Sequence, residues 1–118
     1  MNKKTIGIVG VGSHFNKRIY SILSKSKFFE IKGILRKKKK NFKNIKNFSE
    51  KDFFKKKFDF IYIATPTKLH EKFIIKSLKN GSHVICEKPF ATGKKNINKI
   101  LNLSKLKKKL IFESFPYV

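Results

Sequence analysis

The stretch TIGIVGVGSHF (residues 5–15) decides the fold. Its first half, residues 5–9, is β-branched at four of five positions, as expected of a central parallel strand that is covered on both faces. Two glycines close the strand, and apolar residues then recur at helical spacing to about residue 25. The stretch therefore predicts a strand, a glycine turn and a helix over residues 13–25.

The glycine turn holds the first two glycines of the dinucleotide-binding pattern G-x-G-x-x-G, at Gly10 and Gly12. The first glycine of that pattern permits the tight turn, and the second lets backbone amides approach a pyrophosphate. Phe15 replaces the third glycine, so either the helix stands further from the sheet or the ring turns away. Ser13 and His14 complete the turn as candidate cofactor-binding residues, although His14 could equally face solvent. The alternative to a cofactor site is an ordinary glycine turn without a ligand.

Strands and helices alternate along the rest of the chain. Apolar runs predict strands at residues 28–35, 60–64, 82–86 and 110–115. Helix signals predict a short helix over residues 49–57 that begins at Ser49, a helix capped by Thr67 that ends at Asn80 and Gly81, and a last helix from Thr92. Residues 36–48 are rich in lysine without a clear period, which predicts a solvated loop. The fold class is therefore α/β, a doubly wound parallel sheet of the Rossmann type, in one domain over residues 1–118.

Apolar residues mark each of the three longer helices. In the first, Ile19, Ile22 and Leu23 recur at helical spacing, and the second has an apolar face made of Leu69, Phe73, Ile74 and Leu78. The last helix contains Ile97, Ile100, Leu101, Leu103 and Leu106.

The charge of the chain needs its own explanation. Of 30 basic residues only Arg18 and Arg36 are arginines, and the formal net charge is +23. A nucleic-acid surface is one reading, but specific phosphate and base contacts favour arginine, so drift in an A/T-rich genome is favoured and nucleic acid is disfavoured as a partner. The single cysteine, Cys86, indicates a core thiol in a reducing compartment, and the sequence predicts a cytoplasmic protein without a membrane span. No His, Cys or carboxylate spacing indicates a metal site.

The end of the second predicted strand bears on the choice of cofactor. Chains that bind NAD usually have an acidic residue there for the ribose hydroxyls, whereas this chain has Arg36 and Lys37. Such a cationic pair suits a 2′-phosphate, which favours NADP over NAD. The alternative is that the two residues merely start the solvated lysine run.

Three segments carry a resemblance to a known family. GVGSHF (10–15), FDFIYIATPTKLH (58–70) and above all NGSHVICEKPFATG (80–93) resemble the N-terminal Rossmann domain of the Gfo/Idh/MocA oxidoreductases, a family that includes glucose-fructose oxidoreductase and inositol dehydrogenase. The resemblance covers essentially the whole chain, and Glu87-Lys88-Pro89 is its most specific element.

The resemblance implies roles for residues after the third and fourth strands. Lys88 takes the place of the lysine that lies near the nicotinamide and the substrate hydroxyl, where its charge orients the reacting group and assists proton transfer. Glu87 could hold or tune that lysine. The turn Ala64, Thr65 and Pro66 is implied to contact the cofactor, and His70 is either a structural residue at the helix start or, less favoured, a catalytic one.

The resemblance also sets limits on the function. Family enzymes continue into a second α+β domain that supplies most substrate contacts and the surface for homo-oligomers. The implied function is the nucleotide-binding domain of an NAD(P)-dependent oxidoreductase that moves a hydride between nicotinamide and a sugar-like secondary alcohol. The alternative is a truncated or standalone module that binds NAD(P) without catalysis, and we expect these residues alone to lack turnover.

Overall fold

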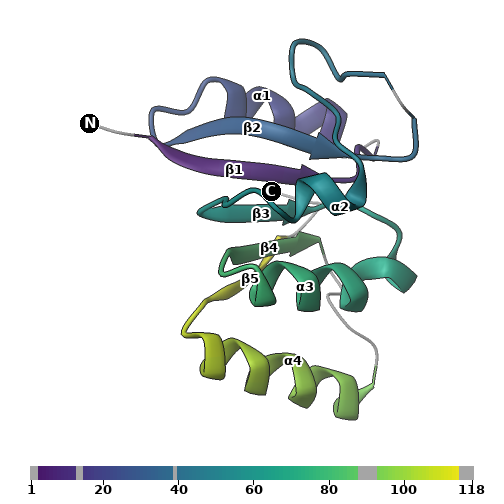
Figure 1. Cartoon of the computed structure of the whole chain (residues 1–118), viewed down its shortest axis with the longest axis vertical. Coiled ribbons are helices and arrows are strands. Elements are labelled where there is room, and N and C mark those ends of the chain that lie inside the picture. The colour runs from purple at the N-terminus through teal and green to yellow at the C-terminus, as the bar shows by residue number, and fades with distance from the viewer. Residues whose placement is uncertain (1–2, 13–14, 39, 88–92, 115–118) are drawn as a thin grey trace.

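The computed structural model describes residues 3–12, 15–38, 40–87 and 93–114, with the element labels of Figure 1. The strands in these ranges are β1 (Lys4–Val9), β2 (Phe29–Leu35), β3 (Phe60–Ile63), β4 (His83–Glu87) and β5 (Ile111–Ser114). The helical segments are η1 (Phe15–Ile19), α1 (Tyr20–Ser24), α2 (Glu50–Phe53), η2 (Thr67–Leu69), α3 (His70–Lys79) and α4 (Lys94–Lys107). None of these helices combines the length and the hydropathy needed to cross a membrane.

The five strands form one parallel sheet in the order β2-β1-β3-β4-β5 (Figure 1). The chain moves outward from β1 to β2, then returns past β1 to β3 and continues in the other direction. The order therefore reverses between β1 and β3, which is the topological switch point of a doubly wound sheet. The predicted fold class is confirmed, with strand bounds that shift by one residue at several ends.

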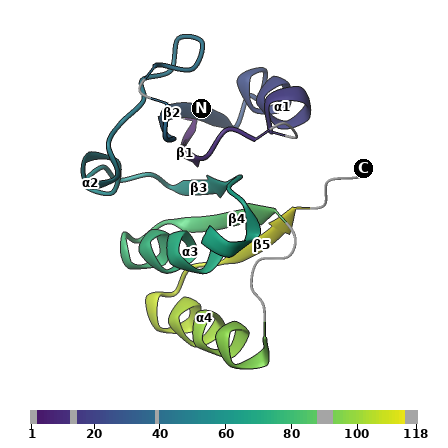
Figure 2. The same ribbon diagram turned by 90° about the vertical axis from the view of Figure 1, so that its right-hand side faces the viewer.

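Helices cover the two faces of the sheet unequally. Segments η1 and α1 lie on one face, and α2, α3 and α4 lie on the other (Figure 2). The larger core cluster joins the second group of helices to the sheet through Phe53, Phe73, Ile74, Leu78 and Ile100. The smaller cluster places Phe15 and Leu23 against β1 and β3.

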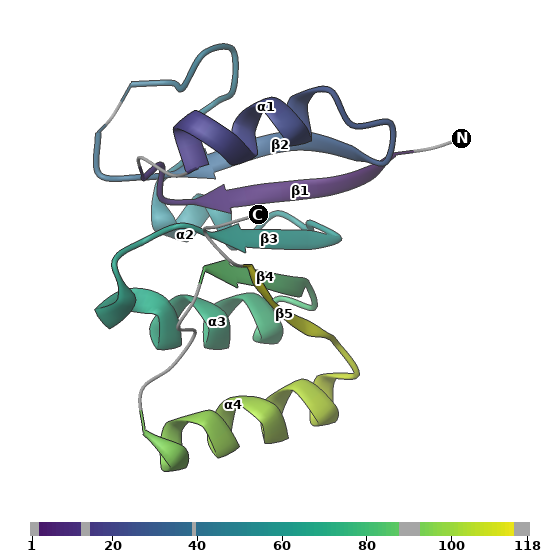
Figure 3. The same ribbon diagram turned by 180° about the vertical axis from the view of Figure 1, so that it is seen from behind.

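On the face of the sheet that α1 covers, one row of side chains at paired positions of the five strands shows where the helix stops covering the sheet. The row crosses all five strands through Ile34, Ile8, Tyr62, Ile85 and Phe112. The first two are fully buried, whereas Phe112 is 46% exposed. Figure 3 shows that α1 lies beside β1 and β2 and reaches neither β4 nor β5. The apolar surface of the sheet thus continues beyond the helix that covers it.

A single rung extends the sheet outside β2. The amide of Ile34 donates to the carbonyl of Lys46 at 3.0 Å, and the amide of Phe48 donates to the carbonyl of Ile34 at 2.8 Å. These bonds make a parallel bridge between Ile34 and Asn47. With this rung the order matches the Rossmann order 3-2-1-4-5-6, in which the third strand lies outside the second.

The predicted solvated loop at residues 36–48 is wrong in part. Phe42 is buried beneath the loop, and Phe48 packs against the main core. A Cβ on Gly33 would lie 2.8 Å from Cε2 of Phe48, so the ring occupies the space that this glycine leaves on β2. The described lysines of the loop are exposed, while its two phenylalanines anchor it.

One helix prediction also needs correction. Thr67 does not cap α3, because the 3-10 turn η2 precedes that helix and no side chain caps either element. Among their described residues, α1 and α4 each bury one residue, Leu23 and Ile100. Other apolar side chains of these two helices are exposed, at Ile22, Leu101 and Leu106. The end of α3 is as predicted, with Gly81 in the left-handed region at φ +88°.

Candidate functional site

An open cavity of about 720 Å³ lies at the C-terminal ends of β1 and β3, where the strand order reverses. The arrowheads of both strands point to this edge in Figure 1. The described residues that line it are Val9, Gly10, Val11, Gly12, Leu35, Arg36, Lys37, Glu50, Ala64, Thr65, Pro66, Lys68, Leu69, Lys72 and Phe73. Open α/β sheets bind ligands in this crevice.

The glycine turn fits against the end of β3 with no room for side chains. Gly10 has φ +84°, and a Cβ there would lie 2.9 Å from Cγ2 of Thr65 and 3.0 Å from the carbonyl carbon of Ala64. A Cβ on Gly12 would lie 3.2 Å from the carbonyl oxygen of Ala64. Backbone bonds fix this approach, because the Gly10 amide donates to Leu35 at 2.7 Å and the Ala64 amide donates to Val9 at 2.8 Å. The two glycines therefore bring the backbone to the cavity wall.

Phe15 stands at the sequence position of the third glycine, and its ring packs in the core. Its ring is fully buried and packs against Tyr62 and Phe42, with ring centroids 5.6 and 6.4 Å away. Of the two alternatives for Phe15, a ring that turns away from the sheet is therefore not the one that the structure adopts. The first helical turn, η1, is a π-helix, which is wider than an α-helix, and its width accommodates the ring between helix and sheet.

The turn after β3 presents an unpaired hydroxyl at the cavity. The Oγ1 atom of Thr65 is buried and has no hydrogen-bond partner. The carbonyl of the same residue lies 2.8 Å from Nε2 of His70, which is 2% exposed and does not line the cavity. His70 thus has the structural place that the sequence favoured. Buried hydroxyls without a partner are costly in proteins, so Thr65 Oγ1 indicates a polar group that arrives with a ligand.

Arg36 and Lys37 both line the cavity at the end of β2. The guanidinium of Arg36 is partly engaged by the chain itself, since Nη2 donates to the carbonyls of Lys40 and Asn41 at 3.0 and 3.3 Å. Its Cζ lies 5.6 Å from the centroid of Phe42, and its buried Nε has no partner. Lys37 is exposed. The pair offers positive charge at the rim, which suits a phosphate.

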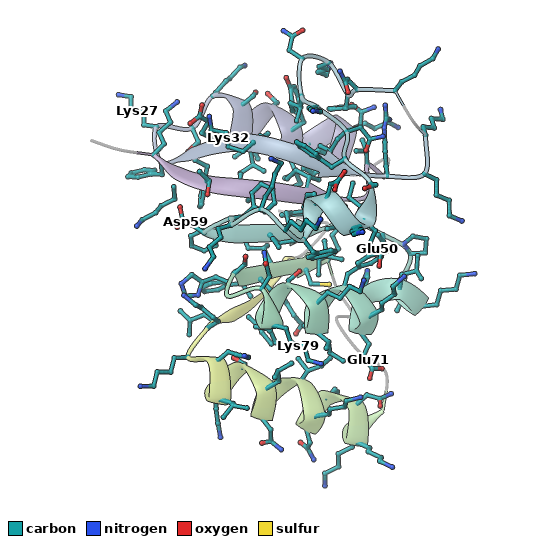
Figure 4. All side chains as sticks on the ribbon, viewed as in Figure 1. Lys27, Lys32, Glu50, Asp59, Glu71 and Lys79 are labelled. Atoms are coloured by element: carbon teal, nitrogen blue, oxygen red, sulfur yellow. The ribbon has the colours of Figure 1, made fainter. Side chains whose placement is uncertain are left out.

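Lysines from α3 and its preceding turn extend this positive rim. Lys68 and Lys72 also line the cavity, and Glu50 of α2 is the one acid among the described lining residues. Glu50 accepts from Lys72 at 3.2 Å and also from Lys76, and Figure 4 labels it between α2 and α3. The bond from Lys76 lowers the pKa of Glu50, against the opposing effect of partial burial, with Lys72 adding to the lowering. The rim keeps an excess of positive charge and therefore favours an anionic ligand.

The end of β4 lies beside this cavity but outside its lining. Glu87 Oε2 accepts a hydrogen bond from the Tyr62 hydroxyl at 3.3 Å, which ties the end of β4 to β3. Lys88, the predicted catalytic residue, lies outside the described residues, as do Ser13 and His14 of the glycine turn. Cys86 is a buried core thiol, and burial raises its pKa well above the usual range.

Sequence reasoning missed Glu50, Lys68, Leu69, Lys72 and Phe73 as cavity residues. A signal existed for part of this group, because the helix that follows the third strand of such a sheet begins at the ligand-binding edge. Lys68 and Lys72 are four residues apart and so lie on one side of the helical segment. In a chain with 30 basic residues, two more lysines carried no weight.

The sequence of the chain is similar to those of known proteins. A model of the oxidoreductase family with an NAD-binding Rossmann fold matches residues 4–115. Scyllo-inositol 2-dehydrogenase (NADP(+)) IolU of Bacillus subtilis (strain 168) is 35% identical over 57 residues, which are 48% of this chain and 17% of that protein. The dTDP-3,4-didehydro-2,6-dideoxy-alpha-D-glucose 3-reductase of Actinomadura kijaniata is 28% identical over 60 residues, 51% of this chain and 18% of that protein.

Solved structures show the same fold. KijD10, a 3-ketoreductase from Actinomadura kijaniata in complex with NADP and TDP-benzene, has a TM-score of 0.87 at 20% identity. The match covers 96% of this chain and 37% of that one. D-galactose-1-dehydrogenase from Rhizobium etli has a TM-score of 0.86 at 17% identity, over 94% of this chain and 37% of that one. The chain thus spans little more than a third of these relatives.

Proposed function

Because this chain belongs to the oxidoreductase family with an NAD-binding Rossmann fold, the Gfo/Idh/MocA family, we propose that its cavity binds NADP or NAD. The Gly10 and Gly12 turn would hold the pyrophosphate, since backbone approaches the cavity there without side chains. Arg36 and Lys37 would lie at the adenosine ribose, and Ala64, Thr65 and Pro66 would lie along the cofactor.

One observation carries this proposal. Thr65 Oγ1 is a buried hydroxyl without a partner in the wall of a cavity that the glycine turn completes. A polar group on a ligand would form a hydrogen bond with Thr65 Oγ1, and negative charge on the same ligand would be attracted by the cationic side chains at the rim. A dinucleotide has both kinds of group, and the cavity of about 720 Å³ falls within the usual range for cofactor sites.

The rim favours NADP over NAD. Arg36 and Lys37 stand where an acidic residue would accept from the ribose hydroxyls, and a 2′-phosphate adds charge that a cationic pair attracts. The relative from Bacillus subtilis carries NADP(+) in its name, and KijD10 was solved with NADP. These relatives support the preference for this chain.

The proposed reaction is hydride transfer between nicotinamide and a sugar-like secondary alcohol. When bound, the nicotinamide supplies the hydride donor or acceptor. Lys88 would hold a proton at Nζ near the substrate oxygen and orient that group, and Glu87, tied to Tyr62, would fix the chain beside it. The relatives that act on an inositol and on a deoxysugar support a polyol or sugar as the substrate class. We also propose that the protein is located in the cytoplasm.

The binding step is tested by mapping amide shifts in a heteronuclear NMR titration with NADPH. Binding at the proposed site perturbs the amides of Gly10, Gly12 and Thr65 before those of α4. Shifts spread over the lysine surface without this focus would count against the cavity. A dinucleotide that perturbs none of these amides would rule out the site.

Turnover distinguishes the enzyme from its alternative, a module that binds NAD(P) without catalysis. Absorbance at the reduced nicotinamide band, with NADP+ and a panel of polyols, reports hydride transfer when this domain is joined to the second, substrate-binding α+β domain that the family resemblance implies. Loss of turnover in Lys88→Ala with unchanged NADPH affinity supports the role of Lys88. Cofactor binding without turnover on any polyol would favour the module.

A further inference from the structure

The side chain of Asn47 holds the start of the cationic segment that follows β2. Asn47 Oδ1 accepts from the amide of Arg36 at 3.2 Å, and Asn47 Nδ2 donates to the carbonyl of Lys38. The amide of Asn47 itself donates to Oδ1 of Asn41 at 3.0 Å. Asn47 therefore bonds to the backbone on both sides of Lys37, the exposed lysine at the cavity rim.

Asn47 is itself fixed to the sheet. Its neighbours Lys46 and Phe48 bond to Ile34 of β2, which places Asn47 in the single rung outside that strand. The loop from Arg36 to Asn47 is thus closed at its two ends by the sheet and by one amide side chain. Closing a loop in this way removes conformational freedom before any ligand arrives.

A buried ring holds the other side of the loop. Phe42 packs beneath it on Phe15 and Tyr20, with the centroid of the Tyr20 ring 5.3 Å away. The Arg36 guanidinium lies over Phe42 and donates to the carbonyls of Lys40 and Asn41. Arg36 therefore uses part of its hydrogen-bonding capacity to hold the backbone of the loop. The positions of the Arg36 guanidinium and of Lys37 therefore depend on the loop keeping this shape.

We propose that Asn47 is a positioning residue that sets the preference for a dinucleotide with a 2′-phosphate over one without it. This inference rests on the proposed binding of NAD(P) in the cavity. A lysine on a mobile loop loses rotamer and backbone freedom when it binds a phosphate, whereas a preformed loop has already lost part of that freedom. Asn47 makes no contact with the cavity, so it acts through the placement of Arg36 and Lys37.

The test compares dissociation constants for NADPH and NADH, measured by nicotinamide fluorescence at one salt concentration, in four chains. Wild type is compared with Asn47→Ala, Asn47→Asp and Asn44→Ala. Asn47→Asp keeps an acceptor for the Arg36 amide and removes the donor to Lys38, so it separates the two ends of the clamp. Asn44→Ala is the matched control, because Asn44 is exposed in the same loop and makes no such bonds.

We expect Asn47→Ala to weaken NADPH binding roughly tenfold while NADH binding stays within about twofold. Asn47→Asp should fall between wild type and Asn47→Ala, and Asn44→Ala should match wild type. An unchanged ratio of the two constants, or an equal loss for both cofactors, would overturn the positioning role. Wild type that binds neither dinucleotide would overturn the proposed function as well, so the two failures are distinguishable.

Discussion

Nε2 of His70 lies 2.8 Å from the carbonyl oxygen of Thr65, and this contact joins the start of α3 to the wall of the cavity. The ring is buried among the residues below the turn rather than in the cavity lining. His70 can therefore hold Thr65 in place without touching a ligand. Two variants of His70 separate this structural role from a catalytic one.

His70→Ala should lower the free energy of unfolding by about 2 kcal/mol, because it removes a buried ring and leaves a carbonyl unpaired. It should also weaken NADPH binding, since the turn is no longer held. His70→Gln retains an Nε2 donor and should recover most of both losses. Denaturant unfolding and fluorescence titration measure the two effects. A variant of His70 that keeps full stability yet abolishes turnover would instead indicate catalysis.

Thr65→Val should move stability and binding in opposite directions. The buried hydroxyl has no partner, so its replacement by a methyl group should raise the free energy of unfolding by about 1 kcal/mol. The same change removes the hydroxyl that is proposed to form a hydrogen bond with the cofactor, and we expect NADPH binding to weaken by roughly fivefold. Thr67→Val, at an exposed position on the same turn, is the control. Equal affinities of wild type and Thr65→Val would separate Thr65 from the cofactor.

Phe15→Gly restores the third glycine of the dinucleotide pattern and should nevertheless harm the protein. The buried ring contacts Tyr62 and Phe42, so its loss should cost about 3–5 kcal/mol of stability. Phe28→Gly is the matched control, because Phe28 is 64% exposed and its loss should cost less than about 1 kcal/mol. Thermal unfolding distinguishes the two. If Phe15→Gly were as stable as wild type, the packing described for η1 would be incorrect.

His83 gives the fold a defined dependence on pH. Its Nδ1 accepts from the amide of Leu110 at 3.0 Å, which requires the neutral ring at that atom. Burial lowers the pKa of His83 below the usual value of 6.5, with Lys109 adding to this and Asp59 opposing it. The unfolded chain binds a proton first as pH falls, so this stability is complete above pH 6.5 and is lost as pH falls towards the lowered pKa.

Asn can supply an acceptor in place of His83 Nδ1 without titrating. His83→Asn should therefore match wild type near neutral pH and lose less stability than wild type as the solution is acidified. Denaturant midpoints measured from pH 7.5 to pH 5 compare the two chains. Parallel curves for both would show that His83 is not the source of the pH dependence.

The strands could be predicted from the sequence because each is a short apolar run closed by glycine, proline or a polar residue. Gly10 and Gly12 could also be predicted, since a tight turn after a strand restricts the residue type. The packing of Phe15, Phe42 and Phe48 could not, because it depends on partners distant in the chain such as Tyr62 and Gly33. Local spacing contains no information about those contacts.

The position of the cavity could be predicted from the sequence, but the full set of residues that line it could not. Arg36, Lys37 and the turn at Ala64 to Pro66 line it, and their binding of a cofactor stays a prediction, whereas Lys68, Lys72 and Glu50 did not stand out in a lysine-rich chain. Asn47 gave no sequence signal at all, because its bonds run to backbone atoms whose places the loop itself defines. The roles of Lys88, Ser13 and His14 remain predictions.

Binding of NADPH at low and high salt, followed by fluorescence in wild type, Gly12→Trp and Asn98→Trp, tests the dinucleotide site most directly. A side chain on Gly12 would meet the carbonyl of Ala64, whereas Asn98 is exposed on α4, far from the cavity lining. We predict saturable binding in wild type and Asn98→Trp that persists at high salt, and its loss in folded Gly12→Trp. Weak binding that salt abolishes equally in all three chains would mean that the lysine surface, and not the cavity, attracts the ligand.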